Sequence, residues 1–352
     1  MGGRNNTEKK EASMKIVDVE SQKKWDDFVS SHKEANFLQS WDFYEFHKNR
    51  GKKIVRRALV DDKEKIIAVY AGVVETAKRG TYLAIAGGPI IDFTDKKLVK
   101  EIFADIKKMG QENGCVFVRV RPQLPLSDKS LKLMNGLGLK KAPMYLSVEY
   151  AGILDLHKTE EEILASASQG FRRKLRKAKK NDIEITADTK SESIEDFCKL
   201  EKKHAERQKY VAFSESFLKK QFEAFEKNNE VLIYTAKKDG EILAQNFMIF
   251  YGPEASYHYG VSSQLGTKYS AAPLLHMAAM KEARKRGCIR YNLWGIVGVE
   301  EKTHRFYGVS EFKRSFGCEE LKYTPAHDLI LKPTKYQFTK IVETARKKIR
   351  HV

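Results

Sequence analysis

The amino-acid sequence predicts an α/β protein in which one mixed helix–strand unit occurs twice. The chain has 352 residues, which at roughly 150 residues per domain corresponds to about two domains. Each half shows the same order of two helices, a hairpin, a third strand, a helix and a final strand. A glycine–cysteine junction precedes the final strand in each copy, Gly114-Cys115 in the first and Gly287-Cys288 in the second, 173 residues apart.

The first copy is expected within residues 14–150, after a polar segment, 1–13, that we expect to be disordered. Its third helix is the best defined, because apolar residues recur at helical spacing from Leu98 to Met109 and Gly114 then ends the helix. The predicted helices are 21–32, 42–50 and 97–113, and the predicted strands are 55–60, 66–75, 82–91 and 115–120.

The second copy is expected within residues 151–332, with a boundary near Tyr150 and with a C-terminal helix, 333–352, that completes the first domain. Thr159 and Glu162 have the spacing of a capping box, which predicts a new helix just after the boundary. The predicted helices are 193–206, 214–227 and 273–286, and the predicted strands are 231–236, 242–251, 256–262 and 288–294.

This repeated order resembles the GNAT acyltransferase fold, present as two tandem domains. The alternative is a coincidence among generic α/β patterns. In GNAT enzymes that use acetyl-coenzyme A, a glycine-rich loop at a helix start grips the pyrophosphate through backbone N–H groups. The corresponding loop here, 263–273, has the single glycine Gly266, and its counterpart 92–95 has none. Neither copy is therefore suited to coenzyme A, and we expect no cofactor.

Composition and charge exclude several classes of protein. Apolar residues make up 41% of the chain and charged residues 32%, which rules out global disorder. A net charge of +18 indicates an anionic partner such as nucleic acid, a phosphorylated substrate or an acidic membrane. Apolar runs fall short of the ~20 residues of a membrane span, and the N-terminus lacks a signal-peptide core. The four cysteines form no CxxC pair and the histidines show no metal spacing, so we expect a cytoplasmic protein with reduced thiols and no metal.

Eight short segments, in order along the chain, resemble sequence boxes of the FemABX peptidyltransferases, which are the peptidoglycan-bridge aminoacyltransferases. The segments are NFLQSW at 36–41, GPIID at 88–92, RVRP at 119–122, RRKLRKA at 172–178, HAER at 204–207, YHYGVSS at 257–263, YNLWGI at 291–296 and GVSEFKRSFG at 308–317. Together they span roughly residues 36 to 320. No single box is decisive, but their shared order is fairly specific.

The resemblance implies two GNAT-like domains and transfer of an amino acid from aminoacyl-tRNA to a side-chain amine of a peptidoglycan precursor. The precursor would be UDP-linked or lipid-linked, and the enzyme would lack integral membrane segments while touching the inner membrane face peripherally. No room exists for the long helical hairpin found in some members, so the chain resembles the short, FemX-like form. In the family the C-terminal helix packs back on the first domain, as 336–349 could here.

The resemblance assigns catalysis to Lys313, as the donor that stabilises the oxyanion during direct aminolysis. Phe312, beside it, would be a stacking surface for the terminal adenosine of the tRNA. The alternative is an ordinary pair of strand residues, with Phe312 in the core and Lys313 in solvent.

The resemblance also supplies precursor-binding residues. Arg207 is similar to the family arginine that contacts the phosphates, although His204 replaces the usual threonine three residues earlier; otherwise Arg207 is an exposed helix residue. A family lysine that contacts phosphate corresponds to His47, with Lys48 next to it. Tyr257 and Tyr259, two apart on a predicted strand, are expected to face the same side and to line the cleft, with Tyr259 preferred. Otherwise they are core or surface aromatics.

The segment from Arg172 to Lys180 holds seven basic residues in nine and no acid. Helical spacing places four of them on one face, and we expect this segment to contact tRNA; the alternative is a solvated helix surface. The predicted tRNA contacts, besides Phe312, are Arg172, Arg173, Arg176, Lys179 and Lys180.

Two other functions remain open at this point. One is an acetyl-coenzyme A-dependent N-acetyltransferase, against which the missing glycine loop counts. The other is a non-catalytic RNA-binding protein on a transferase fold, which the charge of +18 fits equally well.

Overall fold

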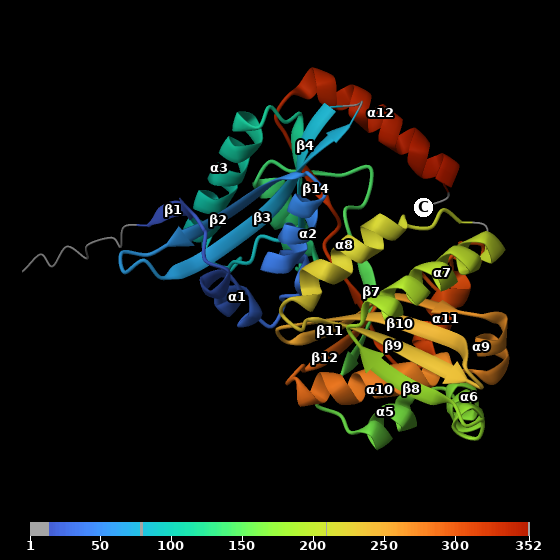
Figure 1. The fold of residues 1–352 in the computed structure, drawn as a ribbon. Coiled ribbons are helices and arrows are strands. Elements are labelled where there is room, and N and C mark those ends of the chain that lie inside the picture. The colour runs from blue at the N-terminus through green and yellow to red at the C-terminus, as the bar shows by residue number, and fades with distance from the viewer. Residues whose placement is uncertain (1–13, 78–79, 209, 351–352) are drawn as a thin grey trace, which may run out of the picture.

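The computed structural model describes residues 14–77, 80–208 and 210–350, and it contains two mixed β-sheets with helices packed against them (Figure 1). Each sheet has seven strands within the described residues. Most neighbouring strands are antiparallel, and each sheet contains one parallel pair, β4–β5 in the first and β11–β12 in the second.

The first sheet has the order β1-β2-β3-β4-β5-β14-β6. Its strands are β1 (Lys15–Asp18), β2 (Lys53–Val60), β3 (Ile66–Ala77), β4 (Gly80–Gly87), β5 (Phe117–Pro122), β14 (His327–Ile330) and β6 (Lys140–Lys141). Helix α3 (Lys96–Glu112) makes the crossover between the parallel strands and buries its apolar face against the sheet. Asp95 caps this helix by accepting hydrogen bonds from the next turn. α4 (Asp128–Gly136) follows β5.

The second sheet has the order β13-β7-β12-β11-β10-β9-β8. Its strands are β13 (Glu319–Lys322), β7 (Tyr150–Asp155), β12 (Arg290–Gly295), β11 (Glu254–Ser262), β10 (Glu241–Tyr251), β9 (Val231–Lys238) and β8 (Glu184–Asp188). Helix α10 (Ala272–Lys285) makes the crossover between the parallel strands, as α3 does in the first sheet. The predicted fold class, a tandem α/β unit, is confirmed.

The last strand does not follow the division expected from the sequence. β14 pairs with β5 and β6 of the first sheet, although its residues fall within 151–332, the range expected for the second domain. The chain therefore returns to the first sheet before the C-terminal helix begins. Only long-range pairing reveals this return, because a four-residue strand carries little periodicity of its own.

The C-terminal helix α12 (Pro333–Arg350) packs against β5 of the first sheet. The ring of Tyr336 lies 5.4 Å from that of Phe117 in an edge-on contact. A buried ion-pair group then ties three segments together, since Arg119 on β5 bonds Asp328 on β14 at 2.8 Å and Glu343 on α12 at 2.7 Å. Because all three charged side chains are buried and paired, the end of the chain is fixed to the first sheet.

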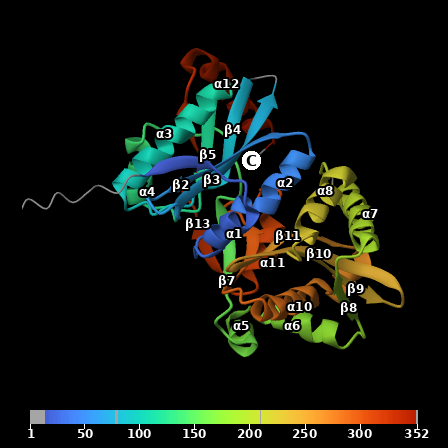
Figure 2. The same ribbon diagram turned by 60° about the vertical axis from the view of Figure 1, so that its left-hand side comes forward.

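One apolar core joins the two halves. It lies between helices α1 (Gln22–Ser30) and α2 (Trp41–Asn49) of the first half and α7 (Ser191–Gln208) and α8 (Glu215–Glu226) of the second. Figure 2 shows α2 beside α8. The ring of Phe37 in the 3-10 helix Phe37–Gln39 lies 5.9 Å from that of Phe225 on α8. Side chains of α2 and of the second sheet therefore hold fixed positions relative to one another.

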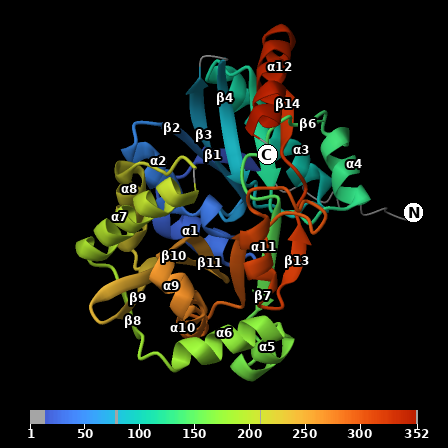
Figure 3. The same cartoon turned by 90° about the vertical axis from the view of Figure 1, so that its right-hand side faces the viewer.

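Four helices cover the other side of the second sheet, and α11 follows β12 (Figure 3). They are α5 (Glu160–Ser166), α6 (Gln169–Lys179), α9 (Gln264–Tyr269) and α10, with α11 at Tyr307–Arg314. The predicted capping box opens α5, since Thr159 and Glu162 each accept a hydrogen bond from the other's backbone N–H. α6 follows α5 directly along the chain.

Candidate active site

Lys313 lies in helix α11 and is buried, with 6% of its surface exposed. Its Nζ donates a hydrogen bond to the carbonyl oxygen of Gly295 at 2.7 Å and lies 5.7 Å from the centre of the Tyr257 ring. The alternative of a strand pair with the lysine in solvent is therefore wrong. The sequence does not separate helix from strand here, because Phe312 and Lys313 are adjacent and two residues cannot show a periodicity.

Burial lowers the pKa of the Lys313 ammonium from 10.5 to about 7. Within the described residues, no carboxylate lies within ion-pair distance of its nitrogen. At pH 7 the protonated and the neutral forms of the Lys313 side chain therefore differ little in free energy. Such a group is suited to donate a hydrogen bond to charge that develops during a reaction.

The carbonyl of Gly295 owes its position to an unusual backbone turn at the end of β12. The preceding residue, Trp294, has φ of 66°, a left-handed conformation that a bulky residue rarely adopts. The side chain of Asn292, itself buried, accepts a hydrogen bond from the backbone N–H of Trp294 at 2.8 Å. This local strain aims the carbonyl at Lys313, and strain of this kind is common at active sites.

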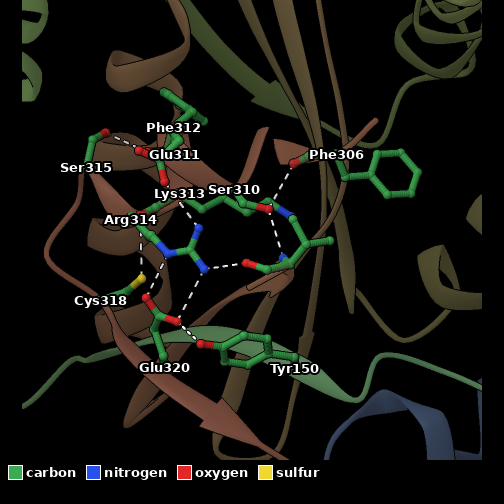
Figure 4. A network of polar contacts seen from close by, with 11 residues as sticks. Tyr150, Phe306, Ser310, Glu311, Phe312, Lys313, Arg314, Ser315, Cys318 and Glu320 are labelled. Carbon is green, nitrogen blue, oxygen red and sulfur yellow. Dashed lines mark hydrogen bonds and ion pairs between the residues drawn. The ribbon is translucent and has the colours of Figure 1, made fainter. Parts of the chain in front are cut away.

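The loop after Gly295 is held to α11 by a network that Figure 4 draws. Ser310 accepts a hydrogen bond from the N–H of Val297 at 2.9 Å and donates one to the carbonyl of Phe306 at 2.9 Å. Arg314 donates to the carbonyl of Val297 and pairs with Glu320 at 2.7 Å. The same helix thus carries Lys313 and fixes the loop that supplies its hydrogen-bond acceptor.

Tyr257 and Tyr259 do not face the same side of the sheet, contrary to the sequence expectation. β11 pairs Tyr259 with Phe247 and Tyr257 with Met248, so the register shifts by one residue and His258 is extra. Such a β-bulge reverses the alternation of side chains. Tyr257 consequently packs on the α10 side, next to Lys313, while Tyr259 packs in the core between the two halves.

Aromatic side chains pack around the catalytic candidates on the α10 side. The ring of His276 lies 4.5 Å from that of Tyr257 and 5.6 Å from that of Phe312. Burial, followed by the charge of Lys313, lowers the pKa of His276 to about 3, so the imidazole is neutral. Phe312 is only partly buried, which leaves part of its ring for another group. His276 was missed in the sequence because nothing in its helix distinguishes it from other core residues.

A row of aromatic side chains leads from Tyr259 to the first half. The ring of Phe213 lies 5.3 Å from that of Tyr259 and stacks on Phe217 at 4.8 Å. The guanidinium of Arg50, at the end of α2, lies over the ring of Phe217 at 4.7 Å from its centre. Since Phe213 is half exposed, the row forms a wall that is open to solvent. Arg50 is a further residue that sequence reasoning missed.

His47 and Lys48 lie on α2 close to this row. Burial, followed by the positive charges of Arg50 and Lys52, lowers the pKa of His47 to about 3, so it is neutral at pH 7. Lys48 is exposed, with its Nζ 3.8 Å from Glu45. Arg50 and Lys52, with Lys53, also line a cavity of about 650 Å³ between the strands and α3. The side chains that can bind a phosphate here are therefore Arg50, Lys52 and Lys53, and not the neutral His47.

Arg207 lies at the end of α7, against the end of β11. Its guanidinium donates a hydrogen bond to the carbonyl of Ser262 at 2.8 Å and lies 2.9 Å from Nδ1 of His204. Arg207 itself is exposed. His204, which replaces the threonine of the family box, therefore contacts the very arginine that the box was expected to provide.

The basic segment forms α6, and its apolar side packs toward α11. The ring of Phe171 lies 4.3 Å from that of Phe316, just beyond Lys313 in sequence. Arg172 differs from the prediction, because its guanidinium donates to three carbonyls at the end of α5, those of Leu164, Ala165 and Ala167. It caps that helix, whereas the other basic residues are exposed, and Lys177 donates a hydrogen bond to the carbonyl of Lys268 at 2.7 Å. The exposed ones are Arg173, Lys174, Arg176, Lys177, Lys179 and Lys180.

With this geometry established, the chain can be compared with known proteins. The sequence model of the FemAB family matches residues 21–135, 134–239 and 218–344. The chain belongs to the FemAB family. The resemblance inferred from the eight sequence boxes is confirmed.

Curated relatives cover almost the whole chain. One is Lipid II:glycine glycyltransferase of Staphylococcus haemolyticus, 20% identical over 90% of this chain and 93% of the relative. Another is Aminoacyltransferase FemA of Staphylococcus epidermidis, 20% identical over 92% of this chain and 97% of the relative. Both carry names of acyl-transferring enzymes, in agreement with the predicted class of enzyme.

Two solved structures share the fold. The crystal structure of FemX is 19% identical and superposes with a TM-score of 0.84, over 94% of this chain and 100% of that one. A tandem GNAT protein from the clavulanic acid biosynthesis pathway is 10% identical, with a TM-score of 0.56 over 90% of this chain and 98% of that one. The tandem GNAT-like architecture predicted for this FemAB family member is confirmed.

In this FemAB protein, the loop that would hold coenzyme A in a GNAT enzyme contains the short helix α9 instead. A Cβ at Gly266 would overlap the carbonyl oxygen of Leu243 on β10. This glycine is therefore required for close packing of α9 on the sheet, which accounts for it without a phosphate ligand. Among the described residues, no helix is both long and apolar enough to cross a bilayer.

Proposed function

We propose that this FemAB protein transfers an amino acid from aminoacyl-tRNA to a side-chain amine of a peptidoglycan precursor. The observation that carries the proposal is the buried Lys313, held against the Gly295 carbonyl with a pKa near 7. The names of the two staphylococcal relatives support the class of reaction. We place the reaction at the cytoplasmic face of the membrane, where both the tRNA and the precursor would be accessible.

The reaction needs positioning and charge stabilisation and no covalent enzyme intermediate. The amine nitrogen attacks the ester carbonyl carbon and forms the new C–N bond, and the carbonyl oxygen becomes an oxyanion. The ester C–O bond then breaks, the ribose oxygen takes up a proton and leaves as a hydroxyl, and the amine nitrogen gives its surplus proton to water or a substrate phosphate. The protonated Lys313 moves its hydrogen bond from Gly295 to the oxyanion, which is the stronger acceptor.

The two substrates approach from different sides in this proposal. The precursor lies along the aromatic row from Tyr259 to Arg50, with Arg207, Lys48 and the cations near His47 close to its phosphates. The acceptor end of the tRNA reaches Phe312 and Tyr257, and its backbone follows the exposed side of α6. Support for the second path is the packing of Phe171 on Phe316, which places the start of the basic helix directly behind α11.

A transfer assay tests the proposal. The purified protein is incubated with tRNA charged with a labelled amino acid, over a panel of amino acids, and with UDP-linked or lipid-linked muropeptide. We expect label to appear in the muropeptide and to disappear after RNase treatment of the charged tRNA. No RNase-sensitive transfer with any amino acid would refute the proposal.

The same preparation decides the two alternatives. Label transfer from acetyl-coenzyme A, with thermal stabilisation by coenzyme A, would assign the protein to the N-acetyltransferases. Binding of tRNA at fixed salt without turnover would assign it to non-catalytic RNA-binding proteins.

A further inference from the structure

Helix α12 has an outer face that nothing in the described residues covers. Its inner face carries the buried Tyr336, Thr339 and Glu343, and two of them bond residues of the first sheet, Tyr336 to Asp328 and Glu343 to Arg119. On the opposite side, Phe338 is 61% exposed and Ile341 is 69% exposed. Figures 1 and 3 show this helix at the periphery of the molecule. Two large apolar side chains one turn apart thus form a ridge in solvent.

Positive charge borders this ridge on one side. At about 100° per residue, Lys335 and Arg346 lie roughly 90–110° from the middle of the ridge, whereas Lys340 and Lys347 lie roughly 130–150° from it on the other side, toward the face that packs on the first sheet. All four are exposed. The sequence of α12 contains one acidic residue, Glu343, and its carboxylate is buried against Arg119. The outer side of the helix therefore presents apolar groups and cations without a negative charge.

We propose that α12 lies flat on an anionic phospholipid surface, with Phe338 and Ile341 inserted at the boundary of headgroups and acyl chains. An apolar ridge bordered by a lysine and an arginine, Lys335 and Arg346, suits the interfacial binding of a helix to an anionic membrane. Each cation near an anionic surface adds to the attraction. RNA is the poorer occupant, because Ile341 has no π-face for a base to stack on. A second copy of the chain is disfavoured, because Lys335 and Arg346 beside the ridge would repel the same residues of the other copy.

This docking also orients the molecule. Just before α12, Lys332 donates a hydrogen bond to the carbonyl of Gly114 at 2.8 Å. Gly114 follows Asn113, which lines the cavity of about 650 Å³ that also contains Arg50 and Lys52. The helix therefore begins beside the cationic cavity, and a membrane under α12 would bring that cavity close to the headgroup layer.

Binding of the full-length protein to vesicles tests the inference, by co-sedimentation with phosphatidylcholine vesicles and with vesicles that contain one third phosphatidylglycerol. We expect binding to the anionic vesicles only. Phe338→Ser together with Ile341→Ser should lower partitioning at least about tenfold. The matched control is Leu126→Ser with Ile289→Ser, which removes two other apolar side chains of 41% and 37% exposure and should leave binding unchanged. Thermal denaturation checks that both variants fold.

Charge is tested separately. Lys335→Gln with Arg346→Gln should lower binding to anionic vesicles by roughly fivefold for each charge removed. Wild-type protein that ignores the anionic lipid, or a serine variant that binds as well as wild type, would overturn the inference. If instead the serine variant loses tRNA affinity or changes the molecular mass measured by light scattering, the face binds RNA or a second copy. The assay contains no tRNA and no precursor, so its result is independent of the proposed transfer reaction.

Discussion

Replacing Lys313 by methionine should move activity and stability in opposite directions. Methionine keeps most of the volume of the buried stem and removes the ammonium group that donates to Gly295. If Lys313 stabilises the oxyanion, turnover falls by about 10²–10³, the effect of losing one such donor. The same change removes a charge that burial disfavours, as the lowered pKa indicates.

The size of the stability change follows from the pKa. A fall from 10.5 to about 7 means that burying the charged form costs up to about 5 kcal/mol. Methionine leaves the Gly295 carbonyl without this donor, which costs about 1–3 kcal/mol. The net expectation is a gain of about 2 kcal/mol in the free energy of unfolding at pH 7. A gain of this sign has precedent where apolar residues replace buried charges.

The pH dependence gives a second signature. Between pH 7 and pH 10.5 the unfolded chain holds a proton on Lys313 that the folded chain has lost. The free energy of unfolding of the wild type should therefore rise with pH across this window, and the methionine variant should lack this increment. Below pH 7 both states are protonated and the slope from this residue vanishes.

Denaturant unfolding at several pH values and the transfer assay measure both effects. Lys302→Met, a change at an exposed lysine in the loop before α11, is the matched control and should alter neither quantity. The reasoning would be refuted on both counts if Lys313→Met lowered the free energy of unfolding while turnover stayed within about threefold of wild type.

Three further predictions concern other parts of the molecule. Gly266→Ala should destabilise the protein by more than about 2 kcal/mol in denaturant unfolding, because the new Cβ overlaps the Leu243 carbonyl; an unchanged midpoint would contradict this. Glu343→Ala should lower the free energy of unfolding by about 3 kcal/mol, because Arg119 loses one of its buried partners. A loss no larger than that caused by alanine at an exposed glutamate would contradict this. Arg176→Gln should weaken tRNA binding and reduce the slope of log affinity against log salt by about 1; an unchanged slope would remove this residue from the RNA path.

Local pattern was sufficient for most helices and strands and for the sequence box that contains Lys313. The helix at Lys96–Glu112 and the capping box at Thr159 follow from spacing and caps that operate over a few residues. The box that contains Lys313 was informative because its residues are contiguous. The helical conformation of this box could not be predicted, because Phe312 and Lys313 alone fit the periodicity of a helix and that of a strand.

The failures share one cause, which is that contacts between distant segments changed the outcome. The bulge at His258 separates Tyr257 from Tyr259 because the strand must pair with β10 in two registers. Arg172 looks like the other basic residues of α6 until the end of α5 is found beside it. His47 is an ordinary titrating residue in the sequence and becomes neutral only through its burial beside other cations.

The sequence by itself determined two repeated α/β units, a large positive charge and a set of ordered boxes that identify the family. Those properties depend on composition and on neighbours within a few positions, where periodicity and capping act. The tertiary structure alone decided that Lys313 is buried against Gly295 with a lowered pKa, and that Phe338 and Ile341 are left in solvent. Burial is a sum over contacts with segments far away in the chain, and it sets which charges are desolvated and which apolar groups still lack a partner.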